Sequence, residues 1–164
     1  INDTMLTQGR DRMLNRGFSD IKYVLSDAET LGFANETFDI VTMGFGLRNV
    51  TNKKVALKEI LRVLKSGGRL VVLEFSTPDN DFIASAYKQY RRLWPRMGKF
   101  LANDAESYQY LDESIDMHPS AEALLSTIRD TGFDRARVRP LLGGIVAIHS
   151  GIRPYTERST ASPG

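Results

Sequence analysis

Two short stretches of this chain carry residues suited to bind a ligand. Asp27 can accept a hydrogen bond from an exocyclic amine such as that of adenine, and the backbone N–H of Ala28 can meet a ring nitrogen. Gly44 and Gly46 allow a ligand to approach the backbone closely. Arg48 follows them and can orient an oxygen or polarise a water molecule. Each feature also has an ordinary structural explanation, as a turn aspartate, a tight turn or a surface arginine.

The two histidines give a weaker chemical signal. His149 is predicted to end a strand and to be structural, whereas His118 precedes Pro119 in a loop and is a minor acid/base candidate. Their spacing is not that of metal ligands, so no metal site is predicted. The sequence also lacks a phosphate-binding Walker loop, a zinc-binding HExxH motif and a GxSxG nucleophile motif.

The candidate residues follow the strands of a predicted α/β fold. Helices alternate with apolar strands in the first half of the chain, which favours a parallel sheet with helical crossovers. Ligands of such sheets bind at the carboxyl ends of the strands. The predicted helices are 2–16 and 54–64, with one further helical turn in the 26–37 loop, and residues 66–68 are expected to end the second helix. The predicted strands are 21–25, 38–45 and 69–75. The strand at 38–45 is expected to be buried on both faces.

The second half begins with an aromatic-rich segment at 81–110. We predict two or three helices there, with a break at Trp94-Pro95. Helices rich in Tyr and Trp can be plain core, or they can wall an apolar ligand pocket. The predicted elements after them are a helix at 121–130, closing strands at 135–139 and 144–149 with Gly143-Gly144 in the turn, and a disordered tail at 152–164.

Composition limits the class of the protein. The 164 residues suit one globular domain, and a formal net charge of +2 gives no case for binding nucleic acid. The absence of Cys excludes disulfides and thiolate chemistry and fits a reducing compartment. No apolar run approaches the ~20 residues that span a bilayer, and the polar opening does not read as a signal peptide. We therefore expect a cytoplasmic protein.

The motifs also resemble a known family. The most specific runs are FDIVTMGFGLRNV at 38–50 and ALKEILRVLKSGGRLVVLEFS at 56–76. Further matches are SDAETLGF, ANDAESYQYLDESIDMHP, TGF at 131–133 and GGIVAIHSG. On these runs residues 1–151 closely resemble the UbiE/COQ5 family, S-adenosylmethionine-dependent C-methyltransferases of ubiquinone and menaquinone synthesis.

The resemblance implies an α/β fold, a Rossmann-like class I methyltransferase domain of seven strands, with residues 81–118 inserted as helices on the substrate side. It implies that S-adenosylmethionine contacts Asp27, Ala28 and the strand end at Gly44. The family often has Ser where this chain has Gly44, so only backbone contacts are expected there. Its lysine-proline-glycine-glycine turn becomes Lys65-Ser66-Gly67-Gly68 here.

The resemblance also implies the chemistry. The substrate would be a polyprenylated benzoquinol or a demethylmenaquinol, whose ring carbon accepts the methyl group. Arg48 would support deprotonation of the quinol through a bound water, and Asn49 would position the ring. Asp104 and Tyr108, in the second family motif, are lesser candidates for the quinol side. The aromatic segment 82–110 would receive the head group and the first isoprene units.

We further expect the chain to be N-terminally truncated. In the family the ribose-binding acid directly precedes the Ile-Asn with which this chain begins. The first two strands and the glycine-rich cofactor loop would then be absent, and the chain as it stands would be inactive. Expected partners are the inner-membrane surface, contacted peripherally, and a second copy or a quinone-synthesis complex. The alternative function is a non-catalytic partner subunit of such a complex, and a nicotinamide-dependent dehydrogenase is disfavoured because the GLRN run has no role in it.

Overall fold

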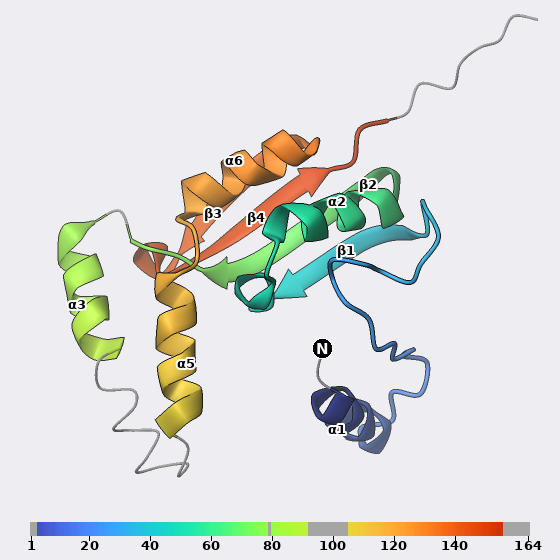
Figure 1. Cartoon of the computed structure of the whole chain (residues 1–164), viewed down its shortest axis with the longest axis horizontal. Helices are drawn as coiled ribbons and strands as arrows, with labels where there is room; N and C mark the ends of the chain where they lie inside the picture. Colours follow the sequence, from blue (N-terminus) through green and yellow to red (C-terminus); the bar gives the residue numbers. More distant parts are fainter. Residues whose placement is uncertain (1–2, 79, 92–104, 156–164) are drawn as a thin grey trace, which may run out of the picture.

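The computed structural model describes residues 3–78, 80–91 and 105–155. In these residues four strands form one sheet in the order β1-β2-β4-β3 (Figure 1). β1 runs parallel to β2, and β4 runs antiparallel to both β2 and β3. The strands are β1 (Phe38–Gly44), β2 (Leu64–Phe75), β3 (Asp134–Leu141) and β4 (Val146–Ile152).

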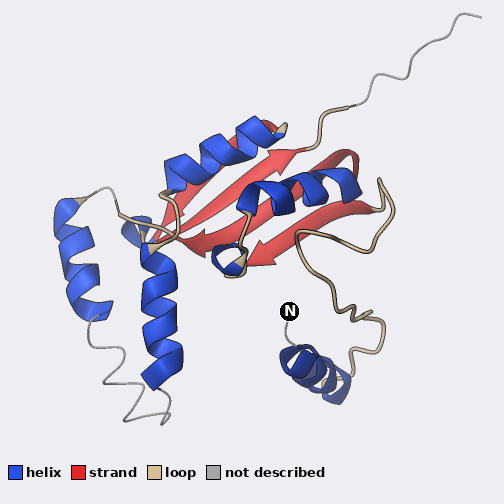
Figure 2. Cartoon of the chain, in the orientation of Figure 1, coloured by secondary structure: helices blue, strands red, loops and turns tan. Residues whose placement is uncertain are grey.

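Two helices cover one face of this sheet. α2 (Lys53–Val63) and α6 (Ala121–Thr131) lie side by side over the strands in Figure 2. Each begins with a side-chain cap, since Asn52 accepts from the N–H of Val55 and Ser120 accepts from the N–H of Ala123. α6 ends at a glycine with φ 109°, a conformation that other residues adopt at a cost.

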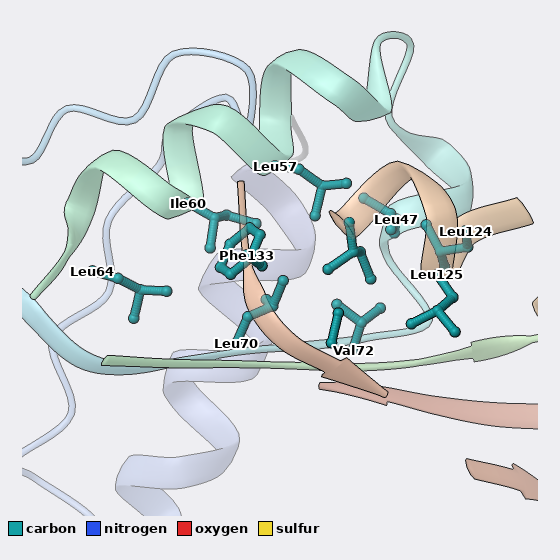
Figure 3. Close-up of a cluster of buried hydrophobic side chains, with 11 residues drawn as sticks. Leu47, Leu57, Ile60, Leu64, Leu70, Val72, Leu124, Leu125 and Phe133 are labelled. Carbon is teal, nitrogen blue, oxygen red and sulfur yellow. The ribbon is translucent and has the colours of Figure 1, made fainter. Parts of the chain in front are cut away.

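The core lies between these helices and the sheet (Figure 3). Alternate side chains of β2 point toward the helices because side chains of a strand alternate between its two faces. Leu70 and Val72 are fully buried there and meet Leu57 and Ile60 of α2. The remaining buried members of this cluster are Leu47, Leu64, Leu124, Leu125, Ile128, Phe133 and Ala136.

Two glycines let the layers approach closely. A Cβ on Gly68 would lie 2.7 Å from the carbonyl oxygen of Lys65, and one on Gly151 would lie 2.9 Å from Cβ of Phe133. Neither contact has room for a methyl group. Glycine is therefore required at both positions by packing alone.

The described helices of the 81–118 segment lie beyond the sheet. α3 (Asp81–Arg91) and α5 (Ala105–Asp116) stand past the ends of β1 and β2 at which the arrowheads point (Figure 1). These two parts of the aromatic-rich region are helical, while residues 92–104, with the predicted break at Trp94-Pro95, lie outside the described residues. Two short 3-10 helices, η1 (Leu47–Asn49) and η2 (Leu142–Gly144), follow β1 and precede β4.

The strand predicted at Ile21–Leu25 is wrong. These residues form an irregular connection between α1 (Asp3–Asn15) and the 26–37 loop. A strand needs a hydrogen-bonded neighbour, and the segment pairs with no strand of the described residues. Val24 and Leu25 are accordingly half exposed, and α1 itself has no buried residue.

β1 differs from its prediction as well. It was expected to be buried on both faces, but it lies at the edge of the described sheet and Ile40 is exposed. β2 begins earlier than predicted, at Leu64, so the glycines expected to stop the helix lie inside the strand. α2 ends at Val63 because the register of β2 with β1 already starts at Leu64 opposite Phe38.

The carboxyl-terminal segment is ordered further than predicted. Ile152 belongs to β4, and Arg153 exchanges backbone hydrogen bonds with Gly67 and Gly68. Its guanidinium also pairs with Glu36 at 2.8 Å. Residues 153–155 are therefore fixed to the turn of β2, and 156–164 lie outside the described residues. No helix in the described ranges is long and apolar enough to cross a membrane.

Candidate active site

The centre of the site is an ion pair between η1 and β2. Arg48 lies one turn past the end of β1, and its Nη1 donates to Oε1 of Glu74 at 3.0 Å. The backbone N–H of Arg48 donates to Oε2 of the same carboxylate at 3.2 Å. Glu74 is 0% exposed and the Arg48 side chain 11% exposed. The predicted catalytic arginine is thus held inside the protein rather than on its surface.

Two aromatic rings flank the guanidinium. Arg48 Cζ lies 5.4 Å from the ring centroid of Phe75 and 6.0 Å from that of Phe45. The two rings pack together with centroids 4.8 Å apart. Nη1 also donates to the carbonyl of Phe45. Cation–π contacts and these hydrogen bonds restrict the guanidinium to one orientation.

Asn49 connects the site to α5. Its Oδ1 accepts a hydrogen bond from the hydroxyl of Tyr110 at 3.2 Å. Tyr110 lies in α5, which belongs to the 81–118 segment. This bond therefore docks α5 against η1. Asn49 therefore has a neighbour that the sequence did not suggest.

His118 lies in the loop after α5, as predicted, and it is buried there. Both ring nitrogens lack a hydrogen-bond partner among the described atoms. Burial lowers the pKa of His118 to about 4, an effect that the nearby carboxylate of Glu74 opposes and the charges of Lys53 and Arg48 reinforce. The imidazole is therefore neutral at physiological pH.

His149 is structural, as predicted, although it lies within β4 and not at its end. Its Nε2 is 2.8 Å from the carbonyl oxygen of Ala121, to which it donates. The side chain is buried under α6, and burial lowers its pKa. This bond ties β4 to the first turn of α6.

A cavity near the ion pair has two of the predicted cofactor residues in its lining. It measures about 300 Å³ and brings Asp27 and Ala28 of the 26–37 loop against Gly46 and Asn49. Oδ1 of Asp27 accepts from the N–H of Glu29 at 2.9 Å, which makes it a turn aspartate as well. Two stretches separated by about twenty residues thus meet at the carboxyl end of β1, as predicted for an α/β site.

Side chains of α2 hold the Asp27 loop in the absence of a strand before it. Glu59 accepts from the N–H of Leu31 at 3.0 Å, and Arg62 donates to the carbonyls of Leu31 and Phe33 at 2.9 and 2.8 Å. Hydrogen bonding to Arg62 lowers the pKa of Glu59, so the carboxylate stays charged. Glu29 reaches the N–H of Asn52 at 2.8 Å.

The other predicted site residues divide into two groups. Gly44 ends β1, and a Cβ there would meet nothing within 4 Å, so its backbone is open to a ligand. Tyr108 lies in α5, and Asp104 lies outside the described residues. Sequence reasoning missed the role of Glu74, although a carboxylate in the buried row of Leu70 and Val72 was a visible signal.

A second cavity opens between the end of β2 and helices α3 and α5. It measures about 280 Å³, and its lining includes Ser76, Tyr87, Arg91 and Ile115. Ser76 is buried and its hydroxyl has no hydrogen-bond partner among the described atoms. In the part of the chain that the structure describes, no cluster of His, Asp and Glu could hold a metal ion. Another hollow, of about 410 Å³, lies on the face of the sheet opposite α2 and α6 and shares no residue with the site.

The chain is similar in sequence to known proteins of one family. The model of the ubiE/COQ5 methyltransferase family matches residues 1–153. The chain is 52% identical over 155 residues to a ubiquinone/menaquinone biosynthesis C-methyltransferase of Marinomonas sp., covering 93% of this chain and 62% of that protein. The corresponding protein of Pseudomonas putida is 53% identical over 156 residues, with 94% and 61% covered. The chain thus spans about three fifths of the length of these relatives.

Solved structures confirm the predicted fold class. A SAM-dependent methyltransferase from Aquifex aeolicus superposes with a TM-score of 0.64 at 13% identity, covering 93% of this chain and 65% of that one. The [4+2]-cyclase SpnF gives a TM-score of 0.68 at 18% identity, covering 95% and 65%. At these identities the likeness establishes the fold alone.

Proposed function

Because the chain belongs to the ubiE/COQ5 methyltransferase family, we propose that it acts in S-adenosylmethionine-dependent C-methylation of a polyprenyl benzoquinol or demethylmenaquinol, in ubiquinone and menaquinone biosynthesis. One observation carries this proposal. The cavity with Asp27 and Ala28 and the buried pair of Arg48 with Glu74 meet on one loop, residues 44–49, at the carboxyl end of β1.

The cavity fits an adenine-bearing cofactor. Asp27 offers carboxylate oxygens to an exocyclic amine, and Ala28 offers a backbone N–H beside it. Gly44 leaves space at the strand end, where the rest of the cofactor would pass. When bound there, S-adenosylmethionine supplies an electrophilic methyl group. The residues of the chain then have to place the ring carbon and remove a proton from the quinol.

Arg48 has the properties needed for the proton step. Its guanidinium is paired with Glu74 and flanked by two aromatic rings, and Nε has no partner among the described atoms. A charged N–H beside the phenolic oxygen stabilises the phenolate, directly or through a water. Loss of the phenolic proton drives electron density onto the ring carbon that accepts the methyl group. Asn49, fixed by Tyr110, would position the ring.

The substrate side is proposed to lie at α3 and α5. The cavity of about 280 Å³ between them has the aromatic ring of Tyr87 and the apolar side chain of Ile115 in its lining. Phe82 and Tyr90 project from α3 with exposed fractions of 82% and 53%. Since a prenyl chain lies in a bilayer, we propose peripheral contact with the inner membrane at this helix. Vesicle flotation of the chain and its Phe82→Asp variant measures that contact.

The function is tested by binding and by rescue. Calorimetric titration of S-adenosylmethionine should show binding that Asp27→Asn weakens, while Asp39→Asn, an exposed carboxylate away from the cavity, should leave it unchanged. Rescue of a quinone-deficient methyltransferase mutant by a protein that carries this chain at the full length of its relatives should be lost in Arg48→Ala and kept in Arg69→Ala. Rescue by Arg48→Ala would favour a non-catalytic subunit of a quinone-synthesis complex. Sedimentation measures whether the chain forms a homodimer or joins such a complex.

A further inference from the structure

Glu74 is a carboxylate in a row of apolar side chains. Leu70 and Val72 precede it at alternate positions of β2, and all three side chains are fully buried. Alternate residues of a strand share one face, so Glu74 points into the layer under the helices. Burying a charged carboxylate is costly unless it is paired and hydrogen-bonded. The position therefore demands specific partners.

Those partners all lie at the candidate site. The carboxylate accepts from Nη1 of Arg48 at 3.0 Å, from the backbone N–H of Arg48 at 3.2 Å and from the N–H of Phe75 at 3.0 Å. Two of the three donors belong to one residue, so the carboxylate fixes both the backbone and the side chain of Arg48. The register of β1 on β2 brings Arg48 and Glu74 together. The N–H of Phe45, just after β1, bonds to the carbonyl of Leu73, just before Glu74.

A purely structural ion pair would leave neither partner with a buried unpaired donor. Here Nε of Arg48 is buried and has no hydrogen-bond partner among the described atoms. An unpaired donor of this kind costs about 1–3 kcal/mol. The pair with Glu74 and the rings of Phe45 and Phe75 keep this N–H from turning toward another acceptor.

We propose that Glu74 is a positioning residue for Arg48: it fixes the guanidinium, with its unpaired Nε–H, in the orientation used in the proposed reaction. This inference rests on the proposed function and deepens it, because it assigns the group that orients the arginine. Glu74 acts through Arg48 and does not contact the substrate.

Side-chain NMR tests the positioning directly. In ¹⁵N-labelled protein the Nε–H of Arg48, assigned by its absence from Arg48→Lys, should be rigid by heteronuclear NOE. In Glu74→Gln it should become mobile while the amides of the core keep their shifts. Glu74→Asp, which keeps the charge on a shorter side chain, should give an intermediate result if Glu74→Gln does not fold. An Nε–H that stays equally rigid in both variants overturns the proposal.

Kinetics separate positioning from stability. Glu74→Gln should lower kcat about 100-fold, the order expected for a misplaced group, with KM for S-adenosylmethionine unchanged and Glu74→Asp partly restored. Leu124→Ala is the matched control, since it weakens the same core away from Arg48. Equal losses of kcat in Glu74→Gln and Leu124→Ala would mean that only stability changed, and the proposal would fail.

The two proposals can fail separately. If the chain shows no methyl transfer, the proposed function fails, but the NMR comparison still decides whether Glu74 fixes Arg48. Adding a water-soluble methoxyhydroquinone should then shift the Nε–H resonance of Arg48 in the native chain and not in Glu74→Gln. If the resonance does not shift in the native chain, Arg48 does not respond to a phenol, which contradicts the role proposed for it.

Discussion

The two halves of the candidate site are built differently. The half around Arg48 rests on the central strand β2 and on fully buried side chains under α2 and α6. The half around Asp27 has no strand before it among the described residues and is fixed mainly by hydrogen bonds between its backbone and the side chains of Glu59, which accepts, and Arg62, which donates. The first half depends on packing and the second on a few charged side chains. Stability and ligand affinity should therefore separate when the two halves are mutated.

The largest effect is expected under the buried half. Leu70→Ala removes a fully buried side chain from the core cluster, and such changes cost about 2–5 kcal/mol. Urea denaturation measures the loss in the free energy of unfolding. A change below about 1 kcal/mol would show that the core collapses around the gap and that the two halves differ less than their burial indicates.

The next effect depends on pH. His118 has a pKa of about 4 when folded, against 6.5 in the unfolded chain, so the unfolded state binds more protons between these values. Stability is therefore complete above pH 6.5 and falls as pH drops toward 4, by about 3 kcal/mol for this group. Urea denaturation at pH 7.5, 5.5 and 4.5 measures this slope.

His118→Leu is the control for the pH effect. Glu74, Arg48, Lys53 and His149 all act on His118, and burial also lowers the pKa of His149. The difference in pH dependence between the native chain and the variant measures the contribution of His118 alone. The variant should lose part of the slope of the free energy of unfolding against pH and should be as stable as the native chain at pH 7.5. Parallel slopes for the two proteins contradict the assignment.

A smaller effect is expected in the loop half. Arg62→Met keeps the aliphatic stem but removes the donors to Leu31 and Phe33, which should cost about 1 kcal/mol because the group is partly exposed. Its affinity for S-adenosylmethionine should fall more clearly than its stability, as measured by calorimetry. Lys58→Met, exposed on the same helix, should change neither. If Arg62→Met binds as tightly as the native chain, the loop is held by other contacts.

The smallest effect is expected before that loop. Val24 is half exposed in an irregular segment, so Val24→Ala should change stability by less than about 0.5 kcal/mol. The same substitution at Val72, fully buried in β2, provides the matched comparison and should cost several times more. Equal costs would show that residues 21–25 pack as a strand does.

These segments also show how far sequence reasoning reaches. IKYVL at 21–25 and RLVVLEF at 69–75 have similar strand-forming residues, yet only the second lies between two hydrogen-bonded strands. The local pattern predicts the propensity of a segment, whereas pairing depends on what lies beside it. The helices predicted at 2–16, 54–64 and 121–130 agree with α1, α2 and α6 to within a few residues because caps and periodicity are local signals, as at Ser120 and Gly132. The helical turn predicted in the 26–37 loop is wrong, since no helix forms there.

The site was predictable in part for the same reason. Asp27, Ala28 and the GLRN run were found from residue types and motifs, and the structure brings Asp27 and Ala28 to one cavity with Gly46 and Asn49 of that run. The partner of Arg48 is 26 positions away in the chain, and their contact follows from the register of β1 on β2. The bond between Asn49 and Tyr110 likewise depends on tertiary docking. No local pattern encodes either contact.

The tight approaches at Gly68 and Gly151 have a consequence for mutational scanning. Every substitution at these positions places atoms where the carbonyl of Lys65 or the side chain of Phe133 already lies. Selection for function would therefore mark both as intolerant, in a pattern indistinguishable from that of Arg48. Abundance measured alongside activity would separate them, because variants of the two glycines should disappear from the soluble fraction whereas a variant that loses only the proton step should accumulate normally.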